Sequence, residues 1–119
     1  DRITEVNLGA SIVGIRAISG SDPILQGHFP DDPVVPGVMI IEGMAQIAAV
    51  LGRLTEQSYS TVLLTEVSQA RFRRKVIPGD VITYKIVIGK MRKPFFWFEG
   101  EASVDGQPAA SALFSARLA

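Results

Sequence analysis

The sequence contains no cysteine, only one histidine and no excess of either charge. Without cysteine, the chain forms neither disulfide bonds nor thiolate metal sites. With His28 as its single imidazole, a histidine-based metal site is disfavoured as well. Apolar runs such as Val38–Ile41 are short, whereas a membrane span needs about 20 apolar residues. We therefore exclude a disulfide scaffold and expect no membrane insertion.

The chain has 119 residues, of which 47% are hydrophobic. This length fits one domain, spanning residues 1–119, and is too short for two. A domain of this size buries a smaller share of its surface than a larger one does. Association with further copies of the chain is therefore expected.

The net charge of zero conceals a local basic segment at residues 71–93. It holds eight basic side chains against a single acid, Asp80. No RNA-binding signature accompanies them, so we do not expect a nucleic-acid partner. A solvated sheet edge and a docking site for an acidic protein are the two interpretations that stand open. The basic residues are Arg71, Arg73, Arg74, Lys75, Lys85, Lys90, Arg92 and Lys93.

Hydrophobic patterning predicts one long helix and several antiparallel strands. The helix, at 37–53, is apolar around nearly all of its circumference, which predicts burial on all sides. Asp105-Gly106 is a strong signal for a two-residue hairpin turn. We therefore expect an α+β fold in which a sheet wraps around one central helix. The expected strands are 3–8, 11–18, 62–72, 81–88, 95–104 and 109–118, and most of the aromatic residues Phe72, Tyr84, Phe95, Phe96, Trp97 and Phe98 are expected in the core.

Three features of the segment 27–46 could carry acid–base chemistry. Glu42 lies in an apolar helix, with Gln46 four residues later on the same face. A buried carboxyl would stay protonated and act as an acid, whereas a solvent-facing one would simply bond to Gln46 or an arginine. His28, in the Gly/Pro-rich loop at 19–36, suits a base, although a lone histidine is by default structural. Gly37 opens the helix, where unpaired N–H groups suit a carbonyl oxygen that gains charge.

The segment Gly27-His28-Phe29-Pro30 through Pro36-Gly37-Val38-Met39-Ile40-Ile41-Glu42-Gly43-Met44-Ala45-Gln46 resembles the active-site motif of FabZ-type 3-hydroxyacyl-acyl-carrier-protein dehydratases. A second stretch, Ala70-Arg71-Phe72-Arg73-Arg74 through Pro78-Gly79-Asp80, is similar to another motif of that family. The resemblance covers essentially the whole chain. It implies the hotdog fold, in which a curved antiparallel sheet cradles a long helix.

The resemblance also implies where the site lies and what it does. His28 corresponds to the catalytic histidine, Glu42 to the catalytic carboxylate of the other subunit, and Gly37 to the N–H that binds the substrate carbonyl. Substrate-binding residues are expected around them, at Phe29, Val38, Met39, Gly43 and Gln46. Acyl carrier protein is the implied partner, and Arg71, Arg73, Arg74 and Lys75 are the residues expected to meet it. No cofactor is implied.

The family forms dimers with shared sites, and hexamers as trimers of dimers are common. The resemblance also implies a cytoplasmic enzyme. Three departures from the family pattern are visible. Gly43 replaces a frequent alanine, Lys75 replaces a proline, and the family's usual N-terminal segment is not seen before Asp1. Related FabA-type isomerases have aspartate at position 42, so Glu42 favours dehydration without isomerisation. A hotdog acyl thioesterase and a non-catalytic acyl-binding protein remain the alternatives.

Overall fold

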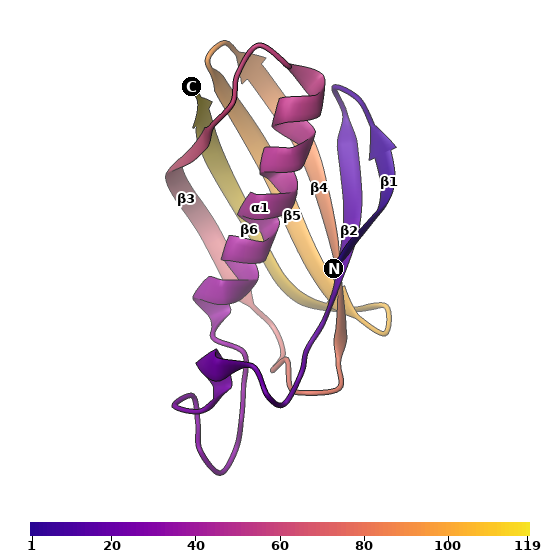
Figure 1. Ribbon diagram of the computed structural model, residues 1–119, viewed down its shortest axis with the longest axis vertical. Coiled ribbons are helices and arrows are strands. Elements are labelled where there is room, and N and C mark those ends of the chain that lie inside the picture. Colours follow the sequence, from indigo (N-terminus) through magenta and orange to yellow (C-terminus); the bar gives the residue numbers. More distant parts are fainter.

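One long helix lies across a six-stranded antiparallel sheet in the computed structural model, which describes residues 1–119. Figure 1 shows the sheet curving behind α1, with the 19–36 loop beneath the first turn of the helix. The helix is Gly37–Thr55, and a short 3₁₀ helix, η1, occupies Pro23–Leu25. The strands are β1 Arg2–Asn7, β2 Ser11–Ala17, β3 Val62–Phe72, β4 Val81–Arg92, β5 Phe95–Val104 and β6 Gln107–Leu118.

The strands follow the order β1-β2-β4-β5-β6-β3. The expected elements are therefore present, and β3 and β5 have the expected limits. Strand β4 continues past Ile88, because a register shift between Ile88 and Lys90 absorbs Gly89 instead of ending the strand. The expected turn joins β5 to β6, with Asp105 and Gly106 at φ 51° and 75°. Such angles suit the tight turns that join antiparallel strands.

Only one side of α1 is buried, which corrects the expectation that the helix is enclosed on all sides. Its core-facing residues are Ile40, Ile41, Met44, Ala48, Leu51 and Gly52. On the opposite side, Val38 is 72% exposed, and Val50 and Leu54 are also exposed. A single sheet covers one face of a helix and no more. The apolar residues on the outer face are therefore left without a partner in a single chain.

Strand β3 is the most exposed long strand of the sheet. It pairs only with β6, so its other edge carries no strand. Leu63 and Leu64 on β3 are 54% and 46% exposed. Unpaired strand edges with apolar side chains are surfaces that natural proteins normally cover. Together with the outer face of α1, β3 therefore forms an apolar surface that one chain leaves open.

By length and hydropathy alone, α1 could cross a membrane, although its uninterrupted apolar runs are short. One such helix is weak evidence, because the core helix of a water-soluble protein can have the same composition. Here α1 contacts β2, β3, β4, β5 and β6. Its apolar composition is accounted for in part by this packing.

Candidate active site

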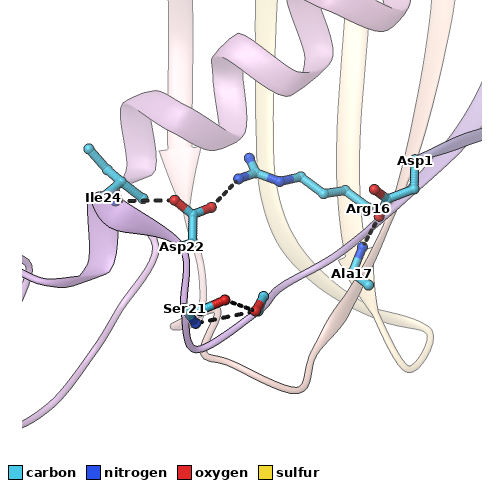
Figure 2. A network of polar contacts seen from close by, with 7 residues as sticks. Asp1, Arg16, Ala17, Ser21, Asp22 and Ile24 are labelled. Atoms are coloured by element: carbon cyan, nitrogen blue, oxygen red, sulfur yellow. Dashed lines mark hydrogen bonds and ion pairs between the residues drawn. The ribbon is translucent and has the colours of Figure 1, made fainter.

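The loop that carries His28 is fixed at its start by Asp22. One carboxylate oxygen of Asp22 accepts a hydrogen bond from the Ile24 N–H at 3.1 Å, which caps η1. The other accepts a hydrogen bond from Arg16 of β2 at 2.9 Å. Leu25, at the end of η1, is buried in the core. The chain thus enters the site from a short, anchored turn, and Figure 2 shows Asp22 between Arg16 and Ile24.

His28 is half-buried, and hydrogen bonds within its own chain hold its ring in place. Its Nδ1 lies 2.7 Å from the Val34 carbonyl oxygen. The Val34 N–H in turn donates to the His28 carbonyl at 2.8 Å. A carbonyl only accepts hydrogen bonds, so Nδ1 carries the proton and Nε2 of the neutral ring has a free lone pair. This tautomer is the one a general base requires.

Phe29 stacks on the His28 ring, with a centroid separation of 4.3 Å, and is itself exposed. Phe29 therefore lies directly beside the imidazole, at a position where the sequence predicts a substrate-binding residue.

Gly37 lies under the aromatic ring of Phe72. A Cβ atom at position 37 would approach that ring to 2.7 Å, so any other residue here would have to displace the ring. Phe72 is half exposed and Phe95 is exposed as well, so these two are exceptions to the expectation that most of the aromatic residues lie in the core. Together with His28 and Val38, Gly37 and Phe72 line a groove of about 600 Å³. The start of α1, with its unpaired N–H groups, therefore meets the imidazole in one cavity.

Glu42 lines a different groove, of about 260 Å³, on the outer side of α1. Its carboxylate is exposed and accepts a hydrogen bond from Gln46 Nε2 at 3.0 Å. Leu63 and Leu64 of β3 lie on the opposite wall of this groove. One chain thus gives Glu42 the solvent-facing arrangement with Gln46, and it does not bring His28 and Glu42 into one cavity.

The other expected substrate-binding residues divide between the two sides of α1. Val38 is exposed and lines the His28 groove. Met39 packs partly against the core. Gly43 faces β4, where a Cβ atom would overlap the Tyr84 hydroxyl. In one chain, Gly43 therefore serves close packing between helix and sheet.

Tyr84 is a buried residue of β4 whose hydroxyl makes no hydrogen bond. Burial raises the pKa of this phenol, and the nearby Arg16 guanidinium partly opposes that effect. The hydroxyl therefore stays protonated at neutral pH. It places a polar atom between α1 and the sheet, next to Gly43.

Three of the four expected partner-binding residues line the His28 groove: Arg73, Arg74 and Lys75. Lys75 pairs with Asp32 at 3.5 Å, and Arg74 lies 3.9 Å from Asp80. Arg73 and Arg71 form no ion pair within the chain. Arg73 is thus the unpaired cation at the groove, while Arg71 lies on β3 outside it.

Reasoning from sequence missed two contributors to the site. Phe72 covers Gly37, and the signal that could have revealed it was its position in the second motif, between Arg71 and Arg73. Val34 holds His28 through a main-chain carbonyl. Because every residue has such a carbonyl, no residue type in the sequence could signal this contact.

Comparison with known proteins supports the family resemblance. Residues 1–113 match the model of the FabA-like domain. A 3-hydroxyacyl-[acyl-carrier-protein] dehydratase FabZ from Rhodopseudomonas palustris strain TIE-1 is 43% identical over 123 residues, which cover 100% of this chain and 81% of the relative.

Solved structures share the fold at lower identity. The dehydratase heterocomplex ApeI:P from Xenorhabdus doucetiae matches with a TM-score of 0.84 and 18% identity, covering 100% of this chain and 81% of that one. A hypothetical thioesterase with coenzyme A from Streptococcus pneumoniae matches with a TM-score of 0.78 and 12% identity, covering 98% and 86%. The expected hotdog fold is confirmed, but because dehydratases and thioesterases share it, fold alone does not decide the reaction.

Sequence identity distinguishes a dehydratase from a thioesterase where the fold does not, because the chain is 43% identical to a FabZ dehydratase over its whole length. The chain belongs to the FabA-like family and, within it, to the FabZ-type 3-hydroxyacyl-acyl-carrier-protein dehydratases.

Proposed function

We propose that the chain removes water from a (3R)-hydroxyacyl thioester on acyl carrier protein and releases the trans-2-enoyl thioester. The enzyme acts in fatty acid biosynthesis and in the cytoplasm. The observation that carries the mechanism is the hydrogen bond from His28 Nδ1 to the Val34 carbonyl. It leaves Nε2 free to accept a proton at the edge of a groove that also contains the start of α1.

In this mechanism, Nε2 of His28 takes the proton from the α-carbon, and the electron pair of that C–H bond forms the double bond. The thioester carbonyl gains negative charge and is bound by the Gly37 N–H. The β-carbon to oxygen bond breaks as Glu42 gives a proton to the departing hydroxyl, which leaves as water. General acid–base groups of this kind contribute about 10²–10⁴-fold each.

The acid comes from a second copy of the chain. Within one chain, Glu42 lines the outer groove between α1 and β3, and His28 lines another. The outer face of α1 and the unpaired edge of β3 form the open apolar surface. A symmetric dimer through this surface would cover it and place Glu42 beside residues of the second chain. This supports a homodimer with shared sites, from which hexamers can be built.

The reaction is tested by separating its products. Purified protein is incubated with 3-hydroxyacyl thioester on acyl carrier protein, and the enoyl product and free thiol are measured side by side. Formation of the enoyl thioester without free thiol supports the dehydratase. Release of thiol without an enoyl product would identify a thioesterase, and binding without either product would identify an acyl-binding protein.

The dimer is tested at Leu63, which is exposed in one chain. Changing Leu63→Lys places a charge on the proposed interface and should shift the protein towards monomer in analytical ultracentrifugation. Dehydration should fall in proportion to the loss of dimer. A matched substitution at Leu8, which is also exposed but lies outside β1 and β2, should leave the mass unchanged. An active monomer would contradict the shared site.

A further inference from the structure

Arg16 occupies an unusual position for a charged residue, on the face of β2 that looks towards α1. Alternate residues of a strand share a face, and Arg16 follows buried Ile12 and Gly14 in this row. Its neighbour across the sheet is buried Ile82. The Arg16 side chain is only 28% exposed. A guanidinium placed this way needs a partner, because an unpaired charge with little access to water is costly.

Asp22 is that partner, and its two oxygens serve two different elements. One binds Arg16 of β2, and the other caps η1 through the Ile24 N–H. The Asp22 carbonyl also accepts a hydrogen bond from the Leu25 N–H at 3.0 Å. Figure 2 shows the Arg16 side chain reaching from its strand to this carboxylate. The pair thus ties the start of the loop to the sheet.

Hydrogen bonds continue from this pair to the imidazole. The His28 N–H donates to the carbonyl of buried Leu25 at 3.3 Å. The His28 ring then meets the Val34 carbonyl, and the Val35 N–H donates to Val76 at 2.8 Å. His28 is therefore held from both sides, by Asp22 and η1 before it and by residues 34–35 after it.

We propose that Arg16 and Asp22 are positioning residues that hold His28 in the tautomer and orientation of a general base. This proposal rests on the proposed function for its kinetic consequence, but its structural consequence can be measured without any substrate. Neither residue lines the His28 groove. Both act through η1 and the main chain of the loop.

The first experiment uses the fact that His28 is the only histidine of the chain. In protein labelled with ¹⁵N-histidine, one imidazole gives all of the ring nitrogen signals. In the neutral form of the ring, the wild type should carry the proton at Nδ1. Asp22→Asn keeps an oxygen for the Ile24 N–H but removes the charge that Arg16 requires. It should shift the ring signals towards a mixture of tautomers.

The second experiment measures dehydration of a small 3-hydroxyacyl thioester. Arg16→Gln and Asp22→Asn should each lower kcat by about 10–100-fold, since a displacement of about 1 Å can cost 10²-fold. KM should stay within about twofold, because substrate binding is not what these residues provide. Arg16→Lys restores the positive charge and should recover most of the lost kcat.

Asp32→Asn is the matched control. It removes a carboxylate from the same loop, but the ion pair of Asp32 with Lys75 is 70% exposed on both sides. This variant should keep the wild-type ring signals and kcat. Unchanged His28 signals in both Arg16→Gln and Asp22→Asn would overturn the proposal. The proposal would also be overturned if the loss of kcat is not recovered by Arg16→Lys and is accompanied by a matching drop in Tm. An inactive wild type with altered ring signals in the variants would reject the proposed function alone.

Discussion

The loop around His28 and the face of α1 around Glu42 differ in how much of their surroundings one chain supplies. His28 is held by the Val34 carbonyl, and its loop is tied to β2 through Asp22 and Arg16. Glu42 is exposed, and the single polar side chain that binds it is Gln46. Folding of one chain thus holds the proposed base in place. Association of two chains would complete the surroundings of the proposed acid.

The largest effect should come from removing each of the two proposed catalytic groups in turn. His28→Ala and Glu42→Gln should each abolish dehydration while the protein stays folded. If the two groups meet across an interface, mixing and exchanging the variants should restore about a quarter of the wild-type activity, because half of the dimers would be mixed and each would have one complete site of two. Turnover is measured before and after exchange.

Activity that stays absent after confirmed exchange of subunits would contradict the shared site. It would also remove the contrast between a base built by one chain and an acid completed by another.

The next effect concerns Gly43, which directly follows Glu42 on α1 and faces Tyr84 of β4. Gly43→Ala should destabilise the protein by about 1–3 kcal/mol, as overpacked cores commonly do. The physical reason is the overlap between the new Cβ atom and the Tyr84 hydroxyl. Chemical denaturation measures the loss, and adding Tyr84→Phe should recover part of it.

A role for Gly43 in an acyl channel predicts a different result. In that case, Gly43→Leu should slow long acyl substrates more than short ones at an unchanged Tm. A uniform loss of activity together with a large drop in Tm would reject the channel role and support packing against Tyr84.

A smaller effect is expected at the basic margin of the His28 groove. Arg73→Glu should raise KM for carrier-bound substrate several-fold and spare a small thioester, because surface charges act mainly on the encounter of two proteins. The effect should weaken as salt is added. Lys75→Glu should change KM less, because Lys75 already pairs with Asp32. Equal losses on both substrates would indicate a structural role for Arg73.

The smallest effect is expected at Glu56, which follows the end of α1 and lines neither groove. The Lys93 ammonium lowers the pKa of Glu56 from 4.5, and Glu56 raises the pKa of Lys93. A lowered carboxyl pKa stabilises the fold above its unfolded value and loses this contribution as pH falls through the folded value. Glu56→Gln should therefore lower Tm slightly at pH 7, and the difference should disappear below the folded pKa. A difference that persists in strong acid would reject this ion pair as its cause.

Sequence predicted the fold well because the signals were local. Asp105-Gly106 marked a turn, and the apolar residues at 37–53 marked the helix. The exposure of Val38 and Leu63 was not predictable in the same way. Hydrophobicity indicates that a residue will be covered, but it does not say whether its own chain or a second copy covers it.

The candidate site shows the same limit. His28, Gly37 and Glu42 were chosen by residue type and motif, and the structure adds the groups that hold them. The Val34 carbonyl and the Arg16–Asp22 pair depend on contacts between distant segments. Asp22 and His28 lie on one loop, but the strand that binds Asp22 could be known only from the fold.

The contact between Gly43 and Tyr84 also bears on how this family can change over time. A methyl group at position 43 would have to occupy space that the Tyr84 hydroxyl already fills. The two positions therefore cannot drift independently. Lineages that carry alanine at position 43 should carry a smaller or shifted side chain at position 84, and ancestors between the two states should have changed the strand residue first.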